Sequence, residues 1–138
     1  MSSVEVQHYL SRARDFLQGA DLLKEDLTLF RFSSALLGIH GAISYCDALR
    51  TGMGSTKLSS DDHQAAARDL RSLLLSRKFS NLRGVDRLEK LLSKKSRIAY
   101  ARSGASENEI KQLILDAKRF EAWAETTGKQ LNIDGWVK

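Results

Sequence analysis

The chain has 138 residues, a net charge of +5, 42% hydrophobic residues, no proline and a single cysteine, Cys46. This length can bury one core, so we expect one domain over 1–138, and a lone cysteine excludes an intramolecular disulfide and a secreted disulfide scaffold. The segment MSSVEVQHYL lacks the features of a signal peptide, and no apolar run reaches the length of a membrane span. We therefore expect a cytoplasmic protein that does not involve a membrane.

Periodic apolar residues predict the first two helices. From Val6 to Leu23 they recur with the 3.6-residue period, which predicts a helix over about 4–25. From Phe30 to Leu49 they cover almost the whole circumference, as expected for a helix that other helices surround. The following TGMGSTKLSS segment is rich in Gly, Ser and Thr and indicates a loop.

The third and fourth helices are predicted on either side of a short break at SNLRG. The third covers about 60–78, with Ser59 or Ser60 as its N-cap and two aspartates in its first turn. The fourth covers about 82–95, and its continuation through Tyr100 is left open.

The fifth helix is predicted over about 107–128. Ser106, with Glu109 three residues later, has the pattern of a capping box at its start. Trp136 in the tail that follows is expected either to fold back or to meet another chain. Because no alternating strand pattern is present, the expected fold is all-α: an up-and-down bundle of four main helices with a short fifth helix.

Most of the positive charge lies in the segment 77–102. This segment has nine Lys or Arg and two acidic residues, a net charge of +7, so the rest of the chain carries −2. Five of its cations alternate at steps of four and three residues and so lie along one side of a helix: Arg83, Arg87, Lys90, Lys94 and Arg97. A solvated helix face and a phosphate-binding surface both fit this pattern. Few aromatic residues lie among the cations, which argues against binding by base stacking.

Two histidines and an aspartate form a candidate polar cluster. His40 and Asp47 are one heptad apart in the second predicted helix, and His63 lies near the start of the third. If they converge, they could act as a general base with its orienting group or as metal ligands, although hydrogen-bonded polar groups near the core fit them as well. No HExxH, CxxC or GxSxG motif and no phosphate-binding glycine loop is present, so we expect no metal and no cofactor. Cys46 has apolar neighbours and is interpreted as a core residue.

Several segments resemble HEPN-type proteins. SALLGIHGAISYCDALRTG resembles their second helix, DDHQAAARDLRSLL resembles their third, and KSRIAY followed by SENEIKQLILDAKRFEAWA is similar to the segment that leads into their last long helix. The resemblance covers about 30–125. It implies an all-helical bundle, commonly a homodimer, that is often encoded in prokaryotic toxin-antitoxin or defence systems beside a nucleotidyltransferase. Active members are metal-independent ribonucleases with an R-x4-6-H motif.

This chain departs from that motif at both key positions. Lys95 stands where the arginine would be, Ser96 follows it, and Tyr100 takes the place of the histidine. Lysine lacks the bidentate fork of arginine, and tyrosine is a poor proton shuttle at neutral pH. A subgroup with an R-N-x-x-E-Y version of this segment is more similar, although Ala99 lacks its acid. In a family-type dimer, Lys95, Arg97 and Tyr100 of two chains would line a shared cleft.

The leading expectation is an RNA-binding or nucleotide-binding HEPN-like dimer without efficient catalysis, with a nucleotidyltransferase-type antitoxin as a candidate partner. Its phosphate contacts would come from the five α-helical cations and Lys95. A second hypothesis is an active endoribonuclease in which His63 or His40 replaces the missing histidine, beside Lys95 and Tyr100. A third is a helical module that binds an acidic protein and no nucleic acid.

Overall fold

A computed structural model describes residues 2–56, 62–100 and 105–137, and for Ser2, Ala99 and Tyr100 it describes the backbone only. The described residues form α1 (Ser2–Leu23), a single 3-10 turn η1 (Lys24–Asp26), α2 (Leu27–Gly52), α3 (His63–Ser76), α4 (Arg83–Tyr100) and α5 (Glu107–Gln130). None of these residues forms a strand. The prediction of an all-α fold is therefore confirmed.

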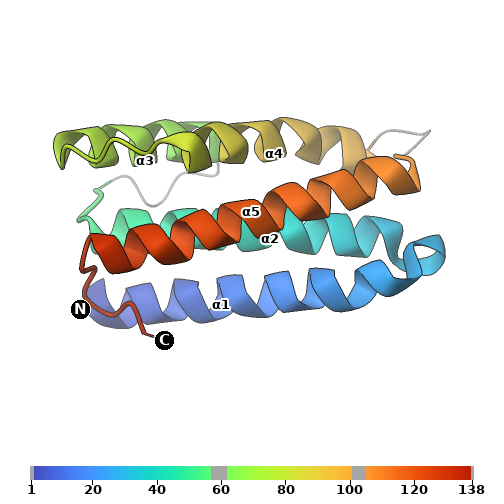
Figure 1. Cartoon of the computed structure of the whole chain (residues 1–138), viewed down its shortest axis with the longest axis horizontal. Coiled ribbons are helices and arrows are strands. Elements are labelled where there is room, and N and C mark those ends of the chain that lie inside the picture. Colours follow the sequence, from blue (N-terminus) through green and yellow to red (C-terminus); the bar gives the residue numbers. More distant parts are fainter. Residues whose placement is uncertain (1, 57–61, 101–104, 138) are drawn as a thin grey trace.

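The helices lie side by side along the long axis of the molecule (Figure 1). α2 is central, because it contacts each of the other four α-helices. This position explains why its apolar residues cover its whole circumference. Ser3–Gly52 contains a window apolar enough to cross a membrane, and 44% of that window is buried inside the protein. The core helix of a soluble protein also has this composition, so the cytoplasmic location stays a prediction.

α2 and α3 run in the same direction, whereas the other consecutive helices are antiparallel. Cys46 of α2 hydrogen-bonds to Ala66 of α3, and Arg50, one turn further along α2, hydrogen-bonds to Asp69, one turn further along α3. α2 and α3 are therefore parallel, although they are consecutive helices of the chain. The simple up-and-down alternation that we expected does not hold at this connection.

The boundaries of α3 differ from the predicted 60–78 at both ends. Asp62 is its N-cap and accepts a hydrogen bond from the backbone N–H of Ala65 at 3.0 Å. The predicted caps, Ser59 and Ser60, lie outside the described residues. α3 ends at Ser76, and Lys78 adopts the left-handed conformation with φ of 59°. A non-glycine residue rarely adopts this conformation, so the sequence indicated the end of this helix only approximately.

The other boundaries agree with the predictions to within a few residues. α4 continues to Tyr100, and the capping box of Ser106 and Glu109 at the start of α5 is confirmed. α2 begins at Leu27, three residues before the apolar run that starts at Phe30, and Phe30 itself has non-helical φ and ψ.

One core joins the five α-helices. Tyr45 and Phe120 are its largest fully buried side chains. α1 approaches α2 closely at Gly41, where a Cβ atom would lie 1.7 Å from Leu17 Cδ2. Cys46 is 2% exposed and its Sγ donates to the Ala66 carbonyl at 3.8 Å, so its interpretation as a core residue is confirmed.

The C-terminal tail folds back onto the helices. The Trp136 ring packs over Gly128 and lies 6.5 Å from the Tyr45 ring. Its Nε1 donates to Glu125 Oε1 at 3.2 Å. Trp136 therefore folds back onto its own chain, which is one of the two alternatives expected from the sequence.

Candidate functional site

α4 has a buried apolar side and a charged side. Val85, Leu88 and Leu91 are among its buried residues. Since successive residues of an α-helix are 100° apart, Arg83, Arg87, Lys90, Lys94 and Arg97 fall within about 80° of one another around the axis. We call these five residues the cation surface. They are exposed or partly exposed.

The acidic residues of α4 point to a different neighbour. Arg71 of α3 donates to Asp86 at 2.6 Å and to Glu89 at 2.8 Å, and these hydrogen bonds raise the pKa of Arg71. Asp86 and Glu89 are therefore engaged on the α3 side of the helix. They pair with Arg71 rather than with the cation surface.

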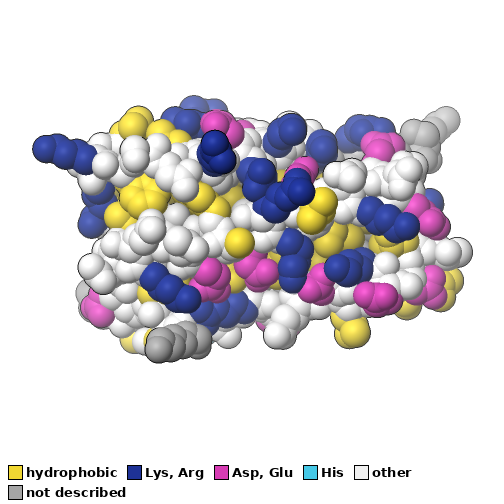
Figure 2. Space-filling model, viewed as in Figure 1, with side chains coloured by type: hydrophobic (Ala, Val, Ile, Leu, Met, Phe, Trp, Pro, Cys, Tyr) yellow, Lys and Arg dark blue, Asp and Glu magenta, His cyan; other side chains and the backbone are white. Residues whose placement is uncertain are grey.

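Only one ion pair of the described residues involves the cation surface. Arg97 Nη1 lies 2.5 Å from Glu109 Oε2 at the start of α5. Four of the five cations, from Arg83 to Lys94, have no carboxylate within ion-pair distance among the described residues. The face shown in Figure 2 carries Lys and Arg side chains over both α4 and α5, while Asp and Glu are more frequent toward the α1 side.

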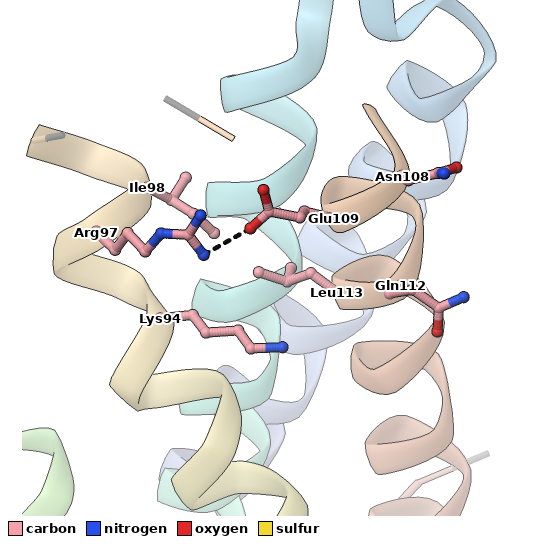
Figure 3. A pocket seen from close by; sticks show the side chains of 7 residues that line it. All are labelled: Lys94, Arg97, Ile98, Asn108, Glu109, Gln112 and Leu113. Carbon is pink, nitrogen blue, oxygen red and sulfur yellow. Dashed lines mark ion pairs between the residues drawn. The ribbon is translucent and has the colours of Figure 1, made fainter. Parts of the chain in front are cut away.

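A cleft of about 310 Å³ lies between the second half of α4 and the first two turns of α5. Figure 3 shows Lys94 and Arg97 reaching from α4 toward α5, with Ile98 and Leu113 between the two helices. Asn108 and Gln112 also line the cleft, but their side chains point away from α4 (Figure 3). The cleft thus combines two cations with an apolar floor.

The predicted polar cluster lies on another face, which we call the histidine face: His40, Asp47, His63 and Lys95. Burial lowers the pKa of His40, and the positive charges of Lys95 and His63 lower it further. Burial raises the pKa of Asp47, against the opposing effects of Arg50 and His63. Side chains of three helices therefore lie within electrostatic range of one another. The ring of Phe16 covers His40 edge-on at a centroid distance of 6.2 Å.

The members of the histidine face do not form a hydrogen-bonded relay. Asp47 accepts a hydrogen bond from Arg50 at 3.1 Å, and within the described residues no hydrogen bond joins it to either imidazole. His63 borders an apolar crevice beside Ile43 and Leu92 that has no room for a water molecule. In this arrangement a general base would lack its orienting carboxylate.

The two cations of the KSRIAY segment belong to different faces. Arg97 lines the cleft beside α5, together with Lys94 from just before the segment. Lys95 is 100° further round the helix than Lys94, and its charge lowers the pKa of His40 of α2. The side chain of Tyr100 lies outside the described residues. The six predicted phosphate-binding residues are thus divided into the cation surface and Lys95.

A buried charge cluster around Arg50 was not predicted from the sequence. The Arg50 side chain is 3% exposed, with Nε donating to Asp69 at 2.8 Å and Nη1 to Asp47 at 3.1 Å. Ser55 Oγ also donates to Asp69, at 2.6 Å. Burial lowers the pKa of Arg50, but the Asp69 hydrogen bond and the nearby negative charges outweigh it and the pKa is raised. The available signal was an arginine that directly follows the apolar run from Phe30 to Leu49 of the second predicted helix.

A second polar cluster was also missed, around Glu125 of α5. Arg14 binds both carboxylate oxygens of Glu125, at 2.7 and 2.9 Å, and Tyr45 donates to Glu125 at 2.7 Å. Arg14 also donates to the Val137 carbonyl at 2.6 Å. With Trp136, these contacts attach the tail to α1, α2 and α5, so the cluster has a structural explanation.

Among the described residues, no three His, Cys, Asp or Glu side chains are grouped so that they could hold a metal ion. Comparison with protein-family models, with curated proteins and with solved structures found no match. The residues and their geometry are therefore the basis for a functional proposal.

Proposed function

We propose that this protein is a HEPN-like helical protein that binds RNA or a nucleotide-bearing partner through phosphate contacts on α4, without efficient catalysis. One observation carries the proposal: five cations share one side of α4 and are exposed or partly exposed, while the acids of the same helix are bound to Arg71. Like charges three or four residues apart oppose helix formation slightly. A phosphate backbone would relieve this repulsion and release counterions.

The resemblance to HEPN proteins adds a homodimer, a cytoplasmic location and a nucleotidyltransferase-type antitoxin to the proposal. All-α architecture is compatible with it but is shared by many unrelated proteins. The mass of the protein in solution, measured by light scattering, tests the dimer. A monomer at micromolar concentration would remove the shared cleft from the proposal.

Salt-dependent RNA binding tests the phosphate contacts. A single-stranded oligouridine is titrated with the wild type and with Arg87→Ala at several salt concentrations. We expect affinity to fall with salt, and Arg87→Ala to weaken binding and reduce the slope of log K against log salt by about 0.7. Lys129→Ala is the matched control, since Lys129 is an exposed cation in the last turn of α5.

Two results would contradict the proposal. One is binding that does not change with salt. The other is an equal loss of affinity in Arg87→Ala and Lys129→Ala, which would show that net charge matters and the α4 surface does not.

A second candidate function is endoribonuclease activity. It is favoured by the placement of His40 and His63 on one face with Lys95. Cleavage of RNA with a bell-shaped pH dependence that His63→Ala or His40→Ala abolishes would support this function. Undiminished cleavage in both variants would exclude the two imidazoles from the reaction.

A further inference from the structure

The cleft between α4 and α5 already contains a negative charge. Glu109 reaches from the first turn of α5 to Arg97, which is the member of the cation surface with a carboxylate partner among the described residues (Figure 3). The Arg97 hydrogen bond and that of the Ser106 backbone lower the pKa of Glu109, so it is ionised at neutral pH. An internal carboxylate thus occupies a place where an external anion could bind.

The cleft has further features that suit a phosphate group. Lys94 lines it together with Arg97, and the start of α5 contributes the positive end of its helix dipole. The guanidinium of Arg97 can bind two phosphate oxygens at once, as it can bind a carboxylate. About 310 Å³ is enough space for a phosphate and part of the group attached to it.

The pair between Arg97 and Glu109 is exposed and therefore weak. Its side chains are 55% and 44% exposed. Pairs of this kind shift an equilibrium by a factor of about 1.4 to 5. An anion with two oxygens for Arg97 and a charge for Lys94 can therefore replace Glu109 at little cost.

We propose that this cleft is a phosphate site at which the ligand displaces Glu109 from Arg97. Glu109 then acts as an internal competitor that lowers the affinity for every ligand that binds to Arg97. The inference rests on the proposed phosphate-binding role of α4 and deepens it. The phosphate belongs either to an RNA backbone or to a free polyphosphate such as that of a nucleotide.

Glu109→Gln is the variant that tests this competition. It removes the charge, while glutamine at this position can still complete the capping box with Ser106, so α5 should keep its start. Glu107→Gln is the matched control, because Glu107 is an exposed acid in the same turn and its loss changes the net charge equally. Thermal melting followed by circular dichroism checks that both variants are folded.

Binding of an oligouridine and of inorganic triphosphate is measured for the wild type and both variants. We expect Glu109→Gln to bind two- to five-fold more tightly than the wild type. For the RNA, the salt slope should stay close to that of the wild type, because Arg97 contacts the phosphate in both bound states. Glu107→Gln should change the affinity much less than Glu109→Gln does. In an Arg97→Ala background, Glu109→Gln should have no further effect.

The ligand arms separate the possible outcomes. A gain with RNA assigns the cleft to the backbone, and a gain with triphosphate alone assigns it to a free polyphosphate and counts against RNA binding by α4. Equal effects of the two glutamate variants, or a gain that persists without Arg97, would overturn the competition. If the wild type binds no RNA, the proposed RNA role fails. Triphosphate binding by the wild type and the two variants still shows whether the cleft is a phosphate site.

Discussion

The Arg50 side chain is 3% exposed and has two carboxylate partners, whereas Arg97 is 55% exposed and has one. Arg87, on the same surface as Arg97, has no carboxylate within ion-pair distance in the described part of the chain. Burial removes water from Arg50, so its partners have to replace that hydration in full. The cations of α4 keep their water and can exchange it for a ligand. Arginines of one chain can thus serve the fold or remain available for binding.

The largest effect that tests this contrast is expected at Arg50. Arg50→Ala leaves Asp69 and Asp47 without their buried cation, and we expect the free energy of unfolding to fall by about 3–5 kcal/mol. Urea unfolding measures it. Arg68→Ala is the control, since Arg68 is 64% exposed and 3.9 Å from its partner, and should cost less than about 1 kcal/mol. Similar losses in both variants would contradict the distinction.

A smaller effect is expected at Tyr45, whose hydroxyl lies in the Glu125 cluster. Tyr45→Phe keeps the buried ring but removes the hydrogen bond to Glu125, and we expect a loss of about 1.5–3 kcal/mol. Tyr9→Phe is the matched control, because Tyr9 is partly exposed. Unfolding curves that are the same for the two variants would show that the cluster adds no stability.

The contrast extends to pH at His40. Because burial lowers the pKa of His40, the unfolded chain takes up this proton at a higher pH than the folded protein does. The free energy of unfolding should therefore decrease as the pH falls below about 6.5, and level off below the pKa of the folded protein. His40→Gln should make this part of the pH dependence flatter. Urea unfolding between pH 7.5 and 5.5 measures it, and an unchanged slope in His40→Gln would refute it.

The smallest effect on stability is expected on the cation surface. Arg87→Ala removes the repulsion of Arg87 with Arg83 and with Lys90. The stability of the protein should therefore be unchanged or higher by about 0.2–0.5 kcal/mol per pair. The same variant should bind RNA less tightly. A clear loss of stability in Arg87→Ala would mean that this arginine supports the fold and that the contrast with Arg50 does not hold.

The fold class and most helix positions could be predicted from the sequence, because apolar periodicity reports directly on which side of a helix is buried. The start of α5 was predictable for another local reason, the capping box of Ser106 and Glu109. The direction of α3 was not. It depends on contacts such as that of Arg50 with Asp69, which join residues distant in sequence.

The candidate site was predictable only within single helices. The spacing from Arg83 to Arg97 placed five cations on one side of α4, and helical geometry alone suffices for this. The pairing of Asp86 and Glu89 with Arg71, and of Glu109 with Arg97, could not be predicted, since these pairs depend on how α3 and α5 pack against α4.

Cys46 is the only cysteine of the chain and lies where α2 contacts α3. Burial raises the pKa of its thiol, so the folded protein should react very slowly with thiol reagents. The rate of chemical labelling at this sulfur would then measure how often α3 separates from α2. Cys46 is thus a natural probe of local opening beside the histidine face, and no engineered cysteine is needed.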